Sequence, residues 1–437
     1  MEAIPLVFFF VVLILLMAGF PVAYTLGGVS FIFGLLTFGF DFFNLLPLRI
    51  WGIMTNYILI AVPLFIFMGV MFEKSGLAEE LLETMALLFG KLHGGLAISV
   101  LLVGAMLAAA TGIVGATVVT MGVLTLPVML KKGYNPQVST GIISASGTLG
   151  QIIPPSIVLV LLGSVLNISV GDLFIAAVIP GFMLVCLYFL WIVYLAIFKP
   201  GHVPSMPRKE LEKFTGTERA KKIITAFLIP LLLIIVVLGS IFAGIASPTE
   251  AAAIGALGAT LLTAARKKFT LNTLKEVMTK TTSLTSMAFM ILVGASAFSL
   301  VFRGMDGDLY LTNLITSADM GAHHFLAIVM IIIFVAGFFI DFIEITFIIV
   351  PVVAPVFVHL NVDLLWIGIL IAINLQTSFL TPPFGFALFF LKGVAPEGIT
   401  TKDIYKGVIP YVGIQLIGLF LVIFFPELAL WLPKILN

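Results

Sequence analysis

The stretch ASGTLGQIIPPSIVLVLLG, residues 145–163, interrupts a long apolar run with two adjacent prolines and a cluster of small polar residues. Proline lacks a backbone N–H and blocks the carbonyl four residues earlier, so two prolines leave several carbonyl groups without helical partners. In lipid each such group is costly, so the break must face protein or a water-filled cavity. The stretch therefore predicts a broken membrane helix rather than a plain span.

The rest of the chain has the composition of a membrane protein. Its 437 residues are 61% hydrophobic and 10% charged, with a mean hydropathy of +1.25, whereas soluble proteins carry about 25% charged residues. Apolar stretches recur along the whole chain, and we expect an all-α polytopic membrane protein in the lipid bilayer. The net charge of +1 indicates no nucleic-acid partner, and the single cysteine, Cys186, excludes an intrachain disulfide.

We expect ten full spans, two re-entrant hairpins and two interfacial helices. The segments 96–130 and 325–358 are each too long for one span and have a polar or glycine-rich middle, so each is predicted to enter and leave by the same face. Segments 44–56 and 270–280 are expected to lie along the membrane surface. The spans are expected at roughly 4–20, 22–40, 57–73, 137–165, 172–198, 223–246, 249–265, 281–302, 365–392 and 408–431.

The basic residues predict how these spans are oriented. With the N-terminus outside, 19 of the 22 Lys and Arg residues fall on one face, and only Arg49, Arg303 and Lys434 fall on the other. Positive charge accumulates on the cytoplasmic side of membrane proteins. We therefore expect the basic loop 199–222 to be cytoplasmic and both termini to be periplasmic, in a bacterial inner membrane.

Proline breaks recur at a nearly constant offset in the two halves of the chain. Each half has a proline 27 residues before a proline pair, repeated at an offset of 228, and an earlier proline repeats at 227. Five spans per half is an odd number, so the second half must be inserted upside down. The pattern predicts an inverted repeat of 5+5 spans, which is typical of secondary transporters. The breaks are Pro21, Pro127, Pro154 and Pro155, and then Pro248, Pro355, Pro382 and Pro383.

The two proline pairs predict ion sites near the bilayer midplane. Freed carbonyls are natural ligands for a small cation, and half-helix N-termini favour an anion. A packing kink that binds nothing is the alternative, but symmetric breaks preceded by hydroxyl and amide side chains favour a site. Ligands that are all oxygen suit the hard cation Na⁺. The candidate sodium ligands are Gly112, Ser146, Gly147, Thr148, Asn374, Thr377 and Thr381, and the candidate coupling residues here are Ser144, Pro154, Pro155, Pro382 and Pro383.

The predicted hairpin tips add two further candidates. The first tip, TGIVGAT at 111–117, has glycines that allow a tight turn beside Thr111. The second tip, GFFIDFIEI at 337–345, carries Asp341 and Glu344, the only carboxylates expected deep in the membrane. Intramembrane acids are functional candidates; the alternative is that this tip lies near the outer surface and its acids are solvated. We assign Thr111 and Asp341 to substrate contact or coupling.

Four motifs carry a resemblance to a known family. The stretches GTLGQIIPPSI, KKGYNP (131–136), SPTEAAAIGA and LQTSFLTPPFGFALFFLKGVAP (375–396) resemble the large membrane subunit of tripartite ATP-independent periplasmic (TRAP) transporters. The resemblance spans nearly the whole chain. The second-half motif is similar to the subgroup for mannitol, chloroaromatic and 2-oxo acid uptake. At the first tip the chain departs from sialic acid members, because TGIVGAT replaces a Ser-Gly-Ser run followed by Asp.

The resemblance implies a function and a set of partners. It implies Na⁺-driven uptake of an organic acid anion, not enzyme catalysis, with a periplasmic solute-binding protein and a small membrane subunit of about four helices. It also implies an elevator mechanism. Residues 1–95 and 223–324 would form the scaffold, 96–165 and 325–392 the transport part, 166–222 a connecting span and cytoplasmic loop, and 393–437 the last span. The alternative is a stand-alone ion-coupled carboxylate transporter that needs no binding protein.

Overall fold

The computed structural model describes residues 4–207, 220–318 and 320–436, and these residues form helices and connecting turns without a strand. The described residues of the first half form ten α-helices, with short 3-10 turns between some of them. Their bounds are α1 Ile4–Met17, α2 Val22–Phe38, α3 Leu46–Met54, α4 Ala61–Lys74, α5 Leu77–Phe89, α6 Gly95–Thr111, α7 Val114–Lys131, α8 Pro136–Thr148, α9 Ile157–Leu166 and α10 Val170–Phe198.

The second half repeats the series after the loop that joins the halves. A π-helical turn at Ile223–Leu228 leads directly into its first helix. The bounds are α13 Ile229–Phe242, α14 Pro248–Ala265, α15 Leu271–Gly304, α16 Gly307–Ser317, α17 Ala322–Ala336, α18 Phe342–Ile348, α19 Val350–His359, α20 Leu364–Leu380, α21 Phe386–Val394, α22 Thr401–Phe424 and α23 Glu427–Leu436.

Both predicted broken helices are broken in the structure. Helix α8 ends at Thr148, a 3-10 turn follows, and the chain becomes helical again only at the start of α9. Helix α20 ends at Leu380 and α21 begins at Phe386. Both proline pairs contain a cis peptide bond. Residues 139–148 of α8 and 366–380 of α20 are all buried, so the helices that lead into the two breaks lie inside the protein.

Each predicted hairpin consists of two helical arms joined by a short turn. Helices α6 and α7 meet at Gly112, whose φ of +60° is the left-handed conformation that glycine adopts without a Cβ penalty. In the second hairpin α17 is followed by the pair α18 and α19, which is bent by 49°. The bend distinguishes the second hairpin from the first, whose second arm α7 is continuous.

The helix bounds recur along the chain as closely as the prolines do. Helix α7 spans 114–131, and adding 228 gives 342–359, which are the first residue of α18 and the last of α19. The same offset carries the start of α8, residue 136, to the start of α20, residue 364. Adding 227 to residue 17, where α1 ends, gives a position close to residue 242, where α13 ends. Adding 227 to residue 38, where α2 ends, gives residue 265, where α14 ends. The repeat therefore extends to the elements themselves.

The number of full-length spans is smaller than the ten we expect from the sequence. Six helices among the described residues are long and apolar enough to cross a membrane, or seven with the bent pair, so the chain is a polytopic helical membrane protein. Helices α1 and α2 are shorter than a full span, and 137–165 and 365–392 are each divided by their breaks. The arm α7, expected as part of a hairpin, is itself long and apolar enough to cross a membrane.

The expected interfacial helix at 270–280 is wrong as a separate element. Residues 271–304 form one helix, α15, of 34 residues. The segment is polar enough to resemble an interfacial helix, but it contains no proline between Leu271 and Gly304, so nothing stops the helix. The other expected interfacial segment, 44–56, contains the short helix α3.

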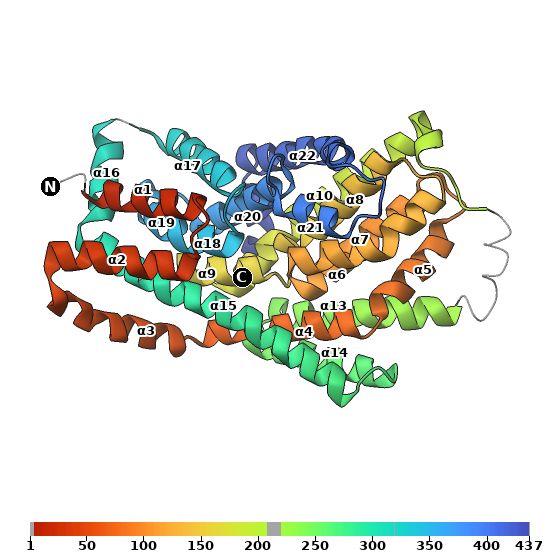
Figure 1. Ribbon diagram of the computed structural model, residues 1–437, viewed down its shortest axis with the longest axis horizontal. Coiled ribbons are helices and arrows are strands. Elements are labelled where there is room, and N and C mark those ends of the chain that lie inside the picture. The colour runs from red at the N-terminus through yellow and green to blue at the C-terminus, as the bar shows by residue number, and fades with distance from the viewer. Residues whose placement is uncertain (1–3, 208–219, 319, 437) are drawn as a thin grey trace.

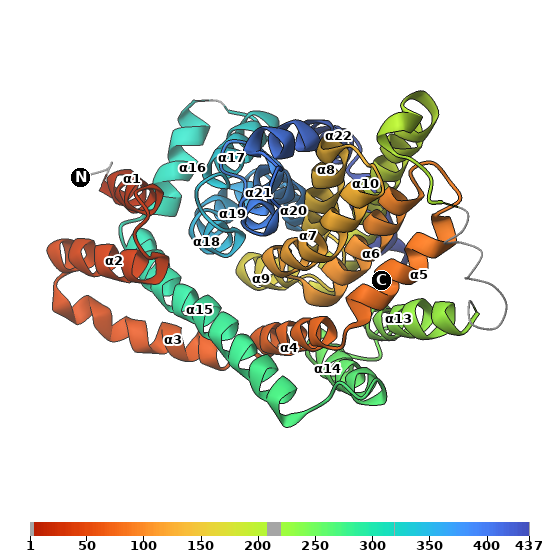
Figure 2. The same ribbon diagram turned by 45° about the vertical axis from the view of Figure 1, so that its right-hand side comes forward.

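The helices divide into an outer group and a central group. Helices α1 to α4 and α13 to α15 pack mainly on one another, with the long α15 running along α2 and α4 (Figure 1). The hairpins and broken helices, α6 to α9 and α17 to α21, form the centre (Figure 2). Helix α22 packs on α8 and α20, and α10 packs on α20 and α22, so both join the central group.

Candidate functional site

A cavity of about 220 Å³ lies where both hairpin tips meet. We call it the tip cavity. The first hairpin contributes Ile113, Val114 and Gly115, and the second contributes Asp341, Phe342 and Ile343. The starts of the resumed helices α9 and α21 also reach it. The outer group supplies Val62, Ile66, Leu284, Met287 and Ala288, and the central group completes the lining with Ile157, Phe379, Phe386 and Phe390.

Close backbone approach fixes the first tip in this position. A Cβ on Gly69 of α4 would lie 2.4 Å from the Cα of Thr111, so the outer group touches the tip backbone directly. A Cβ on Gly112 would lie 3.1 Å from the side chain of Ile157, so the turn also packs against the start of α9. The hydroxyl oxygens of Thr111 and Thr117 are 2.8 Å apart, which closes the tip across its turn. The candidate Thr111 is therefore buried in the tip rather than in the cavity wall.

Asp341 is the one carboxylate that lines the tip cavity. It is half-buried and caps α18, with its Oδ1 accepting a hydrogen bond of 2.6 Å from the Phe342 N–H. Glu344 completes a capping box, because its Oε2 accepts the Asp341 N–H at 3.1 Å. No salt bridge among the described residues involves either acid. A carboxylate in a mainly apolar wall favours the arrival of a cation.

The second tip is held to the second break by aromatic rings. The rings of Phe342 and Phe379 lie 6.3 Å apart, and those of Phe379 and Phe386 lie 5.1 Å apart. Phe339 also contacts Phe384, with the ring centroids 5.3 Å apart. Contacts of this kind add to the apolar burial of each ring. The tip that carries Asp341 and the break at Pro382 and Pro383 are therefore packed as one unit.

At the first break the predicted ligands are buried and face their own helix. Ser146 Oγ donates to the Ile143 carbonyl at 3.2 Å, and Thr148 Oγ1 donates to the Ala145 carbonyl at 2.9 Å. Gly147 packs against Val118 of α7. The Ser144 hydroxyl is buried without a hydrogen-bond partner. Each donating hydroxyl keeps lone pairs that a cation can use.

The prolines of this break and the glutamine before them are also buried. Pro154 and Pro155 lie inside the protein. Both amide atoms of Gln151 are buried without a hydrogen-bond partner. A polar ligand bound here would supply the missing hydrogen bonds. Ser156 Oγ bonds to the Gln151 carbonyl at 2.8 Å and accepts from the Leu159 N–H at the start of α9.

The second break is more open than the first. Thr377 Oγ1 donates to the Ile373 carbonyl at 2.8 Å and Thr381 Oγ1 donates to the Thr377 carbonyl at 2.7 Å. Pro382 is half-buried and Pro383 is exposed. The Pro383 carbonyl accepts a hydrogen bond of 2.6 Å from the Tyr405 hydroxyl. The hydroxyls at both breaks thus follow the same pattern, bonded to carbonyls three or four residues earlier.

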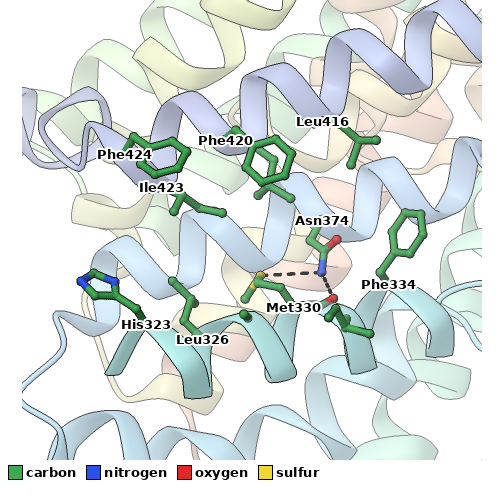
Figure 3. Close-up of a pocket in the computed structure, with 12 residues that line it drawn as sticks. His323, Leu326, Met330, Phe334, Asn374, Leu416, Phe420, Ile423 and Phe424 are labelled. Carbon is green, nitrogen blue, oxygen red and sulfur yellow. Dashed lines mark hydrogen bonds between the residues drawn. The ribbon is translucent and has the colours of Figure 1, made fainter. Parts of the chain in front are cut away.

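Asn374 lies apart from the other candidates. Its Nδ2 donates to the Met330 carbonyl of α17 at 2.7 Å, and it lines a separate apolar groove between α17 and α22 (Figure 3). Phe334 and Phe420 lie on either side of the asparagine in this groove. The structure therefore assigns the Asn374 amide to a contact between helices, whereas Thr377 and Thr381 stay near the break.

The sequence did not point to the wall that the outer group supplies. Val62 and Ile66 of α4 and Leu284, Met287 and Ala288 of α15 line the tip cavity. All five are apolar and stand in apolar helices, so no residue type separates them from residues that face lipid.

Comparison with known proteins identifies relatives along the whole chain. Residues 9–428 match the family model described as tripartite ATP-independent periplasmic transporter, DctM component. The C4-dicarboxylate TRAP transporter large permease protein DctM of Vibrio cholerae is 30% identical, over 98% of this chain and 97% of that protein. The sialic acid TRAP transporter large permease protein SiaM of the same organism is 30% identical over 96% of each chain.

A solved structure supports the fold independently. The Alcanivorax borkumensis YdaH transporter has a TM-score of 0.65 over 98% of each chain, at 14% sequence identity. Fold, cavity and relatives together define a membrane transport protein and not an enzyme. The chain belongs to the DctM family of TRAP transporter large permeases. The expected resemblance to the mannitol, chloroaromatic and 2-oxo acid subgroup finds no support among these relatives, and it stays a prediction.

Proposed function

We propose that the chain carries out sodium-coupled uptake of a small organic acid as the large subunit of a tripartite transporter. The tip cavity carries this proposal, because it brings both hairpin tips and both resumed helices to one place. A periplasmic solute-binding protein would deliver the substrate, and a small membrane subunit of about four helices would brace the outer group. The named relatives act on a dicarboxylate and on sialic acid, both organic acids.

The chemistry around the cavity suits a cation and an anion together. Asp341 supplies a negative charge at the second tip. The starts of α9 and α21, at Ile157 and Phe386, carry the positive ends of their helix dipoles, which favour a substrate carboxylate. Hydroxyl and carbonyl oxygens at the two breaks offer Na⁺ the hard ligands that it prefers. Sodium bound beside the cavity would neutralise the negative charge of Asp341 and so reduce its repulsion of the substrate anion.

The walls favour an acid with an apolar body. Four phenylalanines line the tip cavity, namely Phe342, Phe379, Phe386 and Phe390. Binding sites of this kind take most of their affinity from apolar contact and their orientation from a few polar groups. This composition supports the finer proposal of a 2-oxo acid or chloroaromatic acid as substrate. The two relatives share 30% identity with this chain but differ in substrate, so overall identity does not select between acids.

We further propose an elevator mechanism in the bacterial inner membrane, with both termini periplasmic. The boundary between the outer and central groups runs through the tip cavity, since α4 and α15 line one side and the hairpins line the other. Movement of the central group against the outer group would carry the hairpin side of the cavity, with its bound substrate, past the side formed by α4 and α15. The inverted 5+5 repeat would relate the two end positions of that movement.

Uptake into proteoliposomes tests the proposal. The chain is reconstituted with its small subunit, binding protein is added, and uptake of radiolabelled organic acids is driven by an inward Na⁺ gradient. We expect uptake only with both Na⁺ and the binding protein. Equal uptake driven by a proton gradient in Na⁺-free buffer would refute sodium coupling. Uptake by the chain alone would instead support the stand-alone transporter.

A further inference from the structure

Four polar side chains are buried together where α10, α20 and α22 meet, away from the tip cavity. They are Tyr188 on α10, Gln376 on α20, and Tyr411 and Gln415 on α22. Each is at most 1% exposed. The three helices pack against one another in pairs. Polar residues in apolar membrane helices are costly and need a compensating partner.

The polar atoms of this cluster lie near one another but make no hydrogen bond of good geometry within the protein. The rings of Tyr188 and Tyr411 contact edge to face, with centroids 5.1 Å apart and planes at 81°. The Tyr188 hydroxyl is directed toward the amides of Gln376 and Gln415. Nevertheless both hydroxyls and all four amide atoms lack a hydrogen bond of normal length and angle. Six unpartnered atoms in one place call for a ligand, because native proteins leave few such groups unsatisfied.

We propose that these four side chains hold buried water, which joins the broken helix α20 to α10 and α22. The cluster has hydroxyl and amide donors as well as hydroxyl and amide acceptors, and water is the small ligand that uses both. Water can bridge groups that stand too far apart to bond directly. Gln376 lies six residues before Pro382, so the bound water would give α20 polar contacts with two neighbouring helices close to its break.

The same composition argues against a bound cation. No member of the cluster carries a formal charge, and the two amide NH₂ groups would repel a cation that the oxygens attract. No group of three or more His, Cys, Asp or Glu residues suited to a metal occurs in the described part of the chain. This site is therefore distinct in chemistry from the hydroxyl-rich breaks.

Radiolytic footprinting of the complete protein tests the proposal. Hydroxyl radicals formed from bound water label tyrosines that touch it, even in the interior. Tyr134 is the matched control, because it is 3% exposed and its hydroxyl already accepts the Leu96 N–H at 3.2 Å. We expect Tyr188 and Tyr411 to be labelled several-fold faster than Tyr134, with and without Na⁺. Labelling no faster than Tyr134, or labelling that requires Na⁺, would overturn the proposal.

A double variant provides a second measurement. Gln376→Met with Gln415→Met removes two water partners at similar side-chain volume, and labelling of Tyr188 and Tyr411 should fall to the Tyr134 rate. Thr84→Val on α5 removes another buried, unpartnered hydroxyl far along the chain and should leave the labelling unchanged. Density maps that resolve ordered water should contain a peak between the Tyr188 hydroxyl and the two amides. Direct bonds among the four side chains, with no peak, would refute the site.

Discussion

Gly69 on α4 is the point at which the outer group touches the backbone of the first hairpin tip. A Cβ built there would lie 2.4 Å from the Thr111 Cα, 2.9 Å from the Thr111 carbonyl oxygen and 3.0 Å from the Ala110 carbonyl oxygen. Carbon atoms in contact sit about 3.5–4.0 Å apart. Gly69→Ala must therefore separate α4 from the tip by more than about 1 Å, and both partners are backbone that cannot rotate away.

The cost of such overpacking is about 1–3 kcal/mol. If the substitution destabilises only the arrangement seen here, it shifts the conformational equilibrium by about 5- to 150-fold. We expect a lower melting temperature of the purified protein and slower Na⁺-driven uptake in proteoliposomes. The effect should appear without any change in the residues that line the tip cavity.

Gly28→Ala on α2 is the matched control for this experiment. Gly28 also stands inside a helix, but no atom lies within 4 Å of a Cβ built on it. Alanine is favoured over glycine in helices by about 1 kcal/mol, so this variant should be neutral or slightly more stable. If Gly69→Ala matched Gly28→Ala in both melting temperature and uptake, the close approach of α4 to the tip would be refuted.

Two further sets of substitutions test the site, and one labelling experiment tests the topology. Asp341→Asn should weaken the Na⁺ dependence of uptake while the protein stays folded, because Asp341 alone places a carboxylate in the tip cavity. Glu344→Gln should change the Na⁺ dependence less. Full uptake with unchanged Na⁺ dependence in Asp341→Asn would contradict the assignment. Asn374→Ala should lower the stability of the fold by about 1–3 kcal/mol through loss of the buried hydrogen bond to the Met330 carbonyl, and it should leave the Na⁺ dependence of uptake unchanged. Thr377→Val should instead raise the Na⁺ concentration needed for half-maximal uptake. A changed Na⁺ dependence in Asn374→Ala would show that Asn374 belongs to the sodium site. In a Cys186→Ser background, an impermeant thiol reagent on intact cells should label Leu436→Cys but not Ser205→Cys, and the reverse pattern would invert the topology.

Much of the architecture is readable from the sequence because proline and glycine act locally. The structure has breaks at both proline pairs, Pro154–Pro155 and Pro382–Pro383, whereas the expected breaks at Pro127 and Pro355 are wrong, because these single prolines lie inside α7 and α19. The turn at Gly112 is likewise a local property of the backbone. The constant offset between the halves then predicts which segments correspond, and the helix bounds follow that offset.

The direction of side chains is not readable in the same way. Helix α20 is buried on every face from Trp366 to Leu380, its polar residues included, so no hydrophobic stripe distinguishes its sides. For that reason the sequence groups Asn374 with Thr377, although its amide bonds to α17. The same uniformity conceals the cavity wall on α4 and α15. The polar segment at the start of α15 wrongly predicts a separate helix, because polarity indicates a surface but does not end a helix.

The shared construction of the tip cavity has a consequence for how the chain is made. Ile113, Val114 and Ile157 leave the ribosome long before Phe342, Phe379 and Phe386, which form the opposite wall. During synthesis the first-half tip is therefore an open apolar surface, and it is covered only when the second half has been inserted. Assembly of the cavity is a late event that depends on complete translation. A ribosome that stops in the loop between the halves releases a membrane-inserted fragment with half a cavity, which quality-control proteases can recognise by that exposed surface.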